Sequence, residues 1–248
     1  MNLPHDFVVG TFDDIAQTCP LIDNTLAAIL IEPMQMAGGV RPASVEFLRF
    51  LRQSATDTGA VLIFDEVVTS RLHYYGLQGA WEVYPDMTTL GKYIGGGFPF
   101  GAFGGRADIM EQFNPAARGS SVLHHSGTFN NNIYTMTAAV AAAELVTEQS
   151  LNKLNKLGDD LRATANMIAQ QAGLKDVIFV GYGSTVGIVF LGDRGPALRD
   201  VFYFHLVKRG ILIGRRGFLC LNLTHTKEHI DQFLEGVKAL AEKCGVRH

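Results

Sequence analysis

The chain has 248 residues, a formal net charge of -3 and 47% hydrophobic residues. It is long enough to bury a sizeable core, and its composition is that of an ordinary globular α/β protein. The small net charge argues against nucleic acid or an anionic membrane as a partner.

Other features of the composition narrow the setting. The sequence contains no run of about 18 apolar residues, so no membrane span is expected. The N-terminus lacks the basic start and apolar stretch of a signal peptide. The three cysteines, Cys19, Cys220 and Cys244, are widely spaced. An odd number at such spacing predicts free thiols in a reducing compartment. We therefore expect a cytoplasmic protein.

In chain order, the first half predicts a parallel β-α-β unit. An apolar run at 26–31 ends at Glu32-Pro33 and predicts a buried strand. A helix with one apolar face is expected from Pro42 to Gly59. The run 61–64, which is apolar throughout, predicts a second strand buried on both faces. The connection between these strands should be right-handed.

The middle of the chain is expected to be irregular between short elements. We predict a loop at 69–85, strands at 87–90 and 99–104, a brief helix at 108–113 and a polar loop at 114–132. An alanine-rich helix is expected from Ile133 to Leu145 and onward towards Asn155.

The composition changes near residue 150. We predict helices at 157–168 and 201–209, strands at 177–180, 186–190, 211–213 and 218–223, and a last helix after Thr226. Residues 1–150 are thus expected to belong to a larger domain with a mostly parallel sheet and crossover helices. Residues 151–248 are expected to form a small α+β domain.

Acidic and basic side chains follow two of the expected strands. Asp65 and Glu66 come directly after the strand at 61–64, and Gly91-Lys92 follows the strand at 87–90. The carboxyl ends of strands in open α/β sheets are where such folds bind ligands. By spacing alone, a structural ion pair between Asp65 and Lys92 explains the pattern equally well.

Four ordered segments carry a resemblance to a known family. They are the segment Asp65 to Arg71 (Asp-Glu-Val-Val-Thr-Ser-Arg), the segment from Pro85 to Gly97 containing Thr-Thr-Leu-Gly-Lys, Gly101-Ala102-Phe103-Gly104-Gly105-Arg106, and the segment His125 to Asn132. Together they resemble the class III aminotransferases, pyridoxal-phosphate (PLP) enzymes of fold type I. Within that family the chain is most similar to glutamate-semialdehyde aminomutase and to β-phenylalanine aminotransferase. The resemblance extends over nearly the whole chain.

The resemblance implies roles for three residues around the cofactor ring. Lys92 would form a Schiff base with PLP, and Asp65 would hold the proton on the pyridine nitrogen. Val67 would pack against the face of the ring. Without the resemblance, Lys92 could be a solvated lysine, Asp65 a helix-capping acid and Val67 an ordinary core residue.

The resemblance implies further contacts. Thr128 would reach the cofactor phosphate of a partner subunit, which implies a homodimer; otherwise it is a turn residue. Glu32 and Gln35 would lie near the cofactor ring, or would be polar loop residues at a strand end. Arg215 or Arg216 would hold a substrate carboxylate, or would form a surface ion pair.

Two other patterns carry little weight. The adjacent His124 and His125 lack converging partners, so no metal site is expected. Gly95-Gly96-Gly97 lacks the Lys-Ser or Lys-Thr pair of a nucleotide-binding loop.

The chain departs from the family in lacking its N-terminal half. The Ser-Gly-x-Glu-Ala phosphate cup and the aromatic ring that stacks on the cofactor belong to that half. The expected function is class III amino transfer between an amino donor and a keto or aldehyde acceptor, with a preference for β-amino-acid-like substrates. A shortened, weakly active or inactive partner subunit and an aminomutase are the alternatives. The His-His-Ser-Gly-Thr-Phe segment resembles fungal members, some of them in secondary metabolism.

Overall fold

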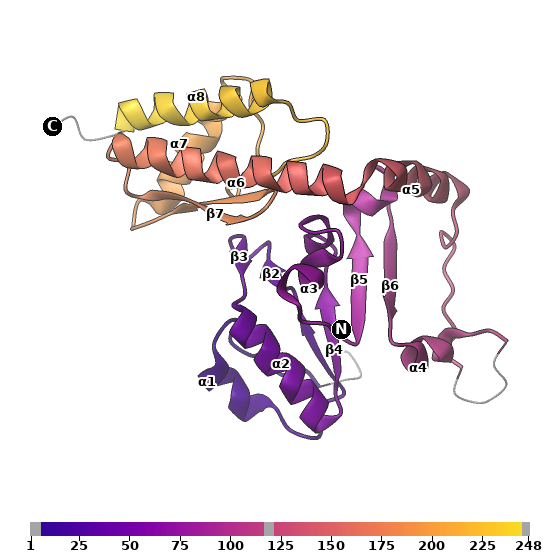
Figure 1. Ribbon diagram of the computed structural model, residues 1–248. Helices are drawn as coiled ribbons and strands as arrows, with labels where there is room; N and C mark the ends of the chain where they lie inside the picture. The colour runs from indigo at the N-terminus through magenta and orange to yellow at the C-terminus, as the bar shows by residue number, and fades with distance from the viewer. Residues whose placement is uncertain (1–5, 117–121, 245–248) are drawn as a thin grey trace. The chain divides into compact units, whose positions relative to one another are not determined.

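The computed structural model describes residues 6–116 and 122–244. The chain divides into two compact units. The first contains the residues up to Pro33, Ala43–Ser70 and Tyr75–Leu145; the second contains Met34–Pro42, Arg71–Tyr74 and the chain from Val146 onward. Each unit has its own hydrophobic core. Figure 1 labels the helices and strands along the chain.

The first unit is built on a four-stranded sheet in the order β1-β4-β5-β6. Its strands are β1 (Ala28–Ile31), β4 (Val61–Asp65), β5 (Met87–Gly91) and β6 (Gly101–Gly105). The first three are parallel, and β6 runs antiparallel to β5. The mostly parallel sheet expected from the sequence is confirmed. Leu62 and Phe64 are fully buried, but Leu30 on the edge strand β1 is 67% exposed.

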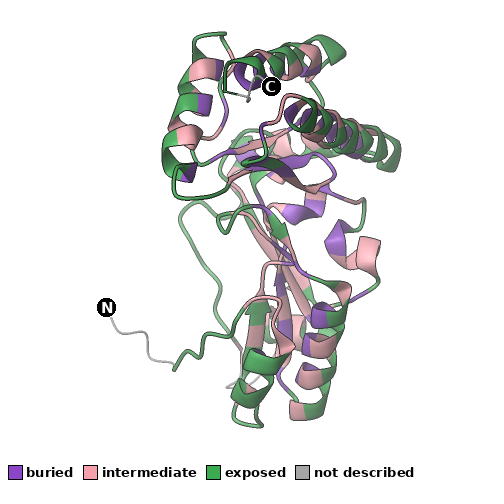
Figure 2. Cartoon of the chain, turned by 90° about the vertical axis from the view of Figure 1, so that its left-hand side faces the viewer, coloured by how far each residue is buried: buried purple, intermediate pink, exposed green. Residues whose placement is uncertain are grey.

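The crossover from β1 to β4 contains the helix α2 (Val45–Thr58). Between β1 and α2 the chain passes through two short strands that belong to the second unit. Ser44 caps the first turn of α2 by accepting a hydrogen bond from Phe47 N, and Gly59 ends the helix with a φ of 77°. Its buried face packs in the same core as Leu62 and Phe64, and the rest of the helix is more exposed (Figure 2). The predicted helix is confirmed, with its start moved to Val45.

The expectation of a loop at 69–85 is wrong. This segment contains the 3-10 turn η2 (Thr69–Arg71) and the helix α3 (Gly76–Trp81). The carboxylate of Glu66 accepts hydrogen bonds from Leu77 N and Gln78 N, so the first turn of α3 is capped by a distant side chain. Capping signals are normally read from the residues next to a helix, and that reading misses this helix.

The remaining elements of the first unit are short, except for one helix. They are α1 (Ile15–Thr18), η1 (Cys19–Leu21), η3 (Lys92–Gly95), α4 (Ala107–Met110), η4 (Glu111–Phe113) and α5 (Ile133–Leu145). The helix expected to continue from α5 towards Asn155 instead stops at Leu145. A new helix, α6 (Glu148–Gln171), begins after Thr147, whose side chain accepts from Ser150 N while Ser150 Oγ accepts from Thr147 N. This capping box starts a separate helix.

The second unit combines helices with an antiparallel sheet in the order β7-β8-β9. Its elements are the short strands β2 (Met34–Gln35) and β3 (Arg41–Pro42), then α6, β7 (Val177–Tyr182), β8 (Thr185–Phe190), α7 (Gly195–Val207), β9 (Phe218–Cys220) and α8 (Lys227–Cys244). The expected α+β character is confirmed. The expectation of a strand at 211–213 is wrong: near these residues the structure has only an isolated bridge between Gly214 and Phe218. None of the helices in the described ranges is long and apolar enough to cross a membrane.

Candidate active site at the carboxyl edge of the sheet

Three sequence-predicted residues follow the carboxyl ends of neighbouring strands in the first unit. Glu32 follows β1, Asp65 ends β4, and Lys92 follows β5. Because β1, β4 and β5 are parallel, these ends meet at one edge of the sheet. This edge therefore collects two carboxylates and one amine.

Lys92 has an uncommon backbone conformation. Its φ is 55°, in the left-handed region, at the point where β5 passes into the 3-10 turn η3. For a non-glycine residue this conformation costs about 1–3 kcal/mol, and such strain gathers at functional sites. The side chain is exposed, so the strained turn presents the amine to solvent.

Val67 packs next to the backbone that leads into Lys92. A Cβ added at Gly91 would lie 3.3 Å from Val67 Cγ1 and 3.1 Å from Phe100 O. A side chain at position 91 would therefore have to displace its neighbours. The absence of a side chain at Gly91 allows the segment after β4 and the end of β5 to approach each other closely.

The carboxylate of Asp65 is half-buried and held on one oxygen. Oδ1 accepts a hydrogen bond of 3.0 Å from Val67 N and one of 3.1 Å from Thr89 Oγ1. Within the described part of the chain, no group donates a hydrogen bond to Oδ2. The carboxylate thus has one fixed oxygen and one oxygen open to a ligand.

Glu66, the next residue, is fully buried. Its carboxylate accepts hydrogen bonds from Thr69 Oγ1, Leu77 N, Gln78 N and Gln78 Nε2, at 2.7–3.2 Å. Burial raises the pKa of the Glu66 carboxyl, and these hydrogen bonds offset only part of that effect. Glu66 is therefore an anchor beneath the site, with no oxygen left for a ligand.

Thr128 lies in an exposed turn before α5. Asn130 N donates to Gly127 O in this turn, and Asn132 Oδ1 caps α5 by accepting from Tyr134 N and Thr135 N. The Thr128 hydroxyl belongs to the first unit, as Asp65 and Lys92 do, and it faces solvent.

The other predicted residues belong to the second unit. Gln35 lies in β2. Arg215 lies 3.8 Å from an Asp200 carboxylate oxygen and 5.8 Å from the centre of the Phe204 ring. The Arg216 guanidinium lies 6.0 Å from the centre of the Phe218 ring. No carboxylate among the described residues pairs with Arg216.

The adjacent histidines do not form part of a metal site in the described residues, where no group of metal-binding side chains occurs. His125 instead packs edge-on against the rings of Phe103 and Phe113, at 5.3 and 6.4 Å between centres. This contact belongs to the packing around β6.

Sequence reasoning missed the residues that hold the predicted ones. Thr89 fixes Asp65, and Gln78 joins Glu66 to Thr88 Oγ1 at 3.1 Å. The register of the β4–β5 pair, which places Asp65 opposite Thr89, carries the signal. Aligning the two strand ends in the sequence would have found the threonine.

The first unit thus has a mostly parallel sheet with Lys92 after one strand and Asp65 at the end of its neighbour. Residues 8–240 match the family model of the class-III aminotransferases. The chain belongs to this family.

Similar proteins include a beta-phenylalanine transaminase from Variovorax paradoxus, with 41% identity over 95% of this chain and 57% of that protein. A glutamate-1-semialdehyde 2,1-aminomutase from Clostridium kluyveri is 35% identical over 95% of this chain and 60% of its own. A solved structure described as a transaminase with PLP bound has a TM-score of 0.89 and 31% identity, and the match covers 96% of this chain and 58% of that one. The chain thus spans a little over half the length of these proteins.

Proposed function

We propose that this chain acts as a PLP-dependent aminotransferase that uses Lys92 and moves an amino group between an amino donor and a keto or aldehyde acceptor. The observation that supports this most is the position of Asp65 and Lys92, which lie at the carboxyl ends of the adjacent parallel strands β4 and β5. PLP, when bound, supplies an aldehyde that reacts with amines and a ring that stabilises negative charge on the substrate carbon.

The residues at the carboxyl edge fit such a cofactor. Lys92 Nζ would attach it, Asp65 Oδ2 would accept the hydrogen bond from the ring nitrogen, and Val67 would cover one face of the ring. Glu32 follows the neighbouring strand β1 and would lie near the ring, as would Gln35. A carboxylate that accepts a ring N–H favours the charged ring through a charge-assisted hydrogen bond. Lys92 and Asp65 therefore have separate tasks, attachment and charge stabilisation.

Arg215 and Arg216, both in the second unit, differ in their surroundings. This difference favours Arg216 as the residue that binds the substrate carboxylate. Arg215 already has Asp200 as a partner. No acidic partner for Arg216 occurs in the described residues. A guanidinium without a carboxylate partner is available for a bidentate contact with an anionic substrate.

A panel of amines and acceptors tests this proposal. The purified chain is given PLP, α-, β- and ω-amino donors with and without a carboxylate, and pyruvate or 2-oxoglutarate as acceptor. We expect amino transfer with at least one donor. Arg216→Ala should raise KM about 10- to 100-fold for carboxylate donors, the value of one charge-assisted contact. Arg215→Ala, its matched control, should not.

The panel also separates the alternatives. The glutamate-1-semialdehyde 2,1-aminomutase relative supports an aminomutase as second candidate. Isomerisation of an amino aldehyde without release of the amine would establish that activity in place of transfer. PLP binding without turnover of any compound would favour a weakly active or inactive partner subunit, and absence of PLP binding would contradict the cofactor proposal.

We also propose that the protein acts as a homodimer, with Thr128 serving the phosphate of the partner's cofactor. Support comes from α5, which is apolar around its whole circumference and buries only Thr135. Ile133, Tyr134 and Val140 are 71%, 72% and 63% exposed. Such a helix normally packs against another surface.

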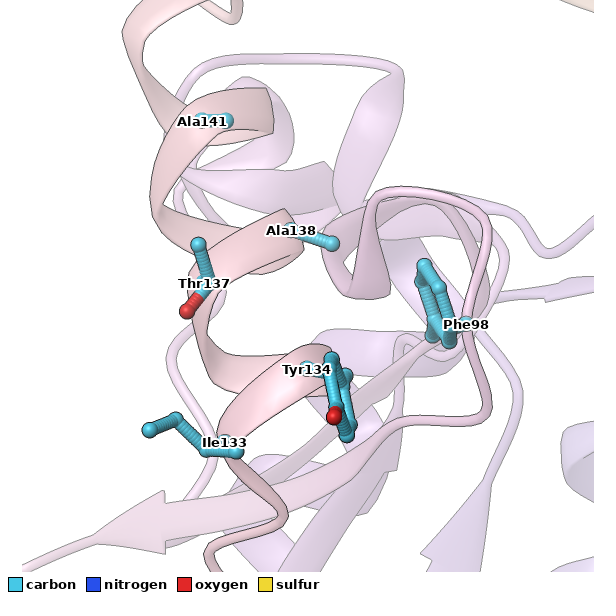
Figure 3. Close-up of a pocket in the computed structure, with 6 residues that line it drawn as sticks. All are labelled: Phe98, Ile133, Tyr134, Thr137, Ala138 and Ala141. Carbon is cyan, nitrogen blue, oxygen red and sulfur yellow. The ribbon is translucent and has the colours of Figure 1, made fainter.

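A groove of about 590 Å³ runs along this helix (Figure 3). Its lining consists of Phe98, Ile133, Tyr134, Thr137, Ala138 and Ala141. Phe98 comes from the segment between η3 and β6, close to the turn that carries Lys92. The Thr128 turn directly precedes α5, and Phe98 directly follows the turn that carries Lys92. Because the groove joins these two segments, we assign it to a second copy of the chain.

Replacing Tyr134 and Val140 together with glutamate should convert the dimer to monomer. An unpaired charge buried in an interface costs about 3 kcal/mol, so the dimer Kd should rise at least roughly 100-fold. Analytical ultracentrifugation across a range of concentrations measures this. Met167→Glu, which changes an apolar residue on α6 that is 50% exposed, is the control and should remain dimeric. A double variant as dimeric as wild type would place the interface elsewhere.

The three cysteines are unpaired, which supports a reducing, cytoplasmic location as part of this proposal. Fluorescence microscopy of the tagged chain in its own cells should show it in the cytoplasm. Recovery of the tagged chain from the culture medium would contradict this location.

A further inference from the structure

The two oxygens of the Asp65 carboxylate are not equivalent. Oδ1 accepts from Val67 N at 3.0 Å and from Thr89 Oγ1 at 3.1 Å. In the part of the chain that the structure describes, Oδ2 accepts no hydrogen bond. A carboxylate with one oxygen saturated and the other open has a defined orientation towards whatever approaches the open side.

Thr89 is itself held in place by the sheet. It lies opposite Asp65 in the parallel register of β4 and β5, and its carbonyl accepts a 3.1 Å hydrogen bond from Glu66 N. Residues in register on adjacent strands point to the same face of a sheet. Because threonine is β-branched, its χ1 angle has few choices. The backbone pairing thus aims the hydroxyl at Asp65.

The opposite side of the same strand end is fixed by Glu66. Successive side chains along a strand point to opposite faces, and the Glu66 carboxylate is saturated by donors from Thr69, Leu77 and Gln78. Gln78 Nε2 also donates to Thr88 Oγ1 at 3.1 Å. The adjacent threonines Thr88 and Thr89 therefore act on opposite faces of the sheet. Thr89 donates a hydrogen bond to Asp65, and Thr88 accepts one from the Gln78 side chain that also holds Glu66.

We propose that Thr89 is a positioning residue that fixes the Asp65 carboxylate so that Oδ2 receives the ring N–H of the cofactor. This inference rests on the proposed function. Without the hydroxyl, only Val67 N holds Oδ1, and the carboxylate gains freedom to rotate away from the ring. Ordering it again on binding then weakens the affinity for PLP.

The test compares Thr89→Val, which removes the hydroxyl but keeps the shape, with Thr88→Val as its matched control. Each variant of the full chain is titrated with PLP to obtain a Kd, and its thermal midpoint is recorded. We expect Thr89→Val to weaken PLP binding roughly 10-fold, the value of one hydrogen bond. Thr88→Val should leave the Kd within about 2-fold, although it also loses a hydrogen bond. Thr89→Ser should restore binding.

A double-mutant cycle with Asp65→Ala separates positioning from a general structural defect. If Thr89 acts through Asp65, Thr89→Val should have no further effect on the PLP Kd in the Asp65→Ala background. Effects that add in full would show that Thr89 acts independently of Asp65 and would overturn the inference.

Other outcomes are distinguishable from failure of the proposed function. A Thr89→Val chain that binds PLP as wild type does, while Asp65→Ala binds it measurably more weakly, overturns the role of Thr89 alone. Equal weakening by Thr88→Val and Thr89→Val also overturns it, because the defect would belong to β5 in general. An unchanged Kd in Asp65→Ala, or no PLP binding by the wild-type chain, overturns the proposed function and this inference together.

Discussion

Lys92→Ala is expected to abolish covalent capture of PLP by this chain. Alanine has no amine to bond the cofactor aldehyde, and the strained turn at φ 55° presents Lys92 at the edge where Asp65 ends its strand. Amino transfer should fall by at least about 10²–10⁴-fold, since the variant also lacks the amine as a proton-transfer group. Borohydride reduction followed by peptide mass measurement detects the captured cofactor directly.

Two controls accompany this prediction. Lys92→Arg keeps the positive charge, but its guanidinium does not form the bond, so it should also fail to capture PLP. Lys153→Ala removes an exposed lysine from α6 and should capture PLP as wild type does. Recovery of the reduced cofactor on any other lysine peptide of the wild-type chain would refute the assignment of Lys92.

Asp86→Ala is expected to cause a large loss of stability in the first unit. Asp86 lies just before β5 and is 5% exposed. One carboxylate oxygen accepts from Leu62 N and Arg52 Nη1, at 2.8 and 2.9 Å, and the other accepts from Arg106 Nη1 at 2.9 Å. Its side chain thus ties α2, β4 and the end of β6 together.

The Arg52 and Arg106 side chains are themselves 26% and 54% exposed, so solvent compensates part of the lost pairing. Leaving Leu62 N and the two guanidinium groups without their shared acceptor should cost about 1–3 kcal/mol, and the urea midpoint should fall by roughly 0.5–2 M. Trp81, the single tryptophan of the chain, belongs to the first unit, so its fluorescence reports on that unit. Asp108→Ala, which removes an exposed partner of Arg106, should leave the midpoint close to wild type. A shift for Asp86→Ala no larger than that of Asp108→Ala would contradict the prediction.

The contribution of Asp86 should also depend on pH in a defined direction. Burial alone raises the pKa of Asp86, but the hydrogen bonds from Leu62, Arg52 and Arg106 outweigh it and hold that pKa below the ordinary value. A depressed folded pKa means that the stabilisation is complete above about pH 3.9. It is lost as the pH falls through the folded pKa. Wild type and Asp86→Asn should therefore converge only in acid.

The strand ends that form the candidate site were accessible to sequence reasoning, but their supports were not. Apolar runs ending in Asp65 and Gly91-Lys92 are local patterns, and each run became a strand with its charged residue at the carboxyl edge. The helix α3 has no cap of its own in the adjacent sequence, because Glu66 caps it from 11 residues away. The separation of α5 from α6 was a local signal that was overlooked, since Thr147 and Ser150 lie in the sequence itself.

The sequence by itself determined the class of fold and the family, and it supplied the residues proposed for the candidate site, because apolar periodicity and short motifs are properties of neighbouring residues. The tertiary structure alone decided which oxygen of Asp65 is open, that Glu66 is an anchor, and that Asp86 joins α2, β4 and β6. These facts depend on strand register and burial. Both arise from contacts between residues far apart in the chain, where local sequence preferences no longer determine which groups meet.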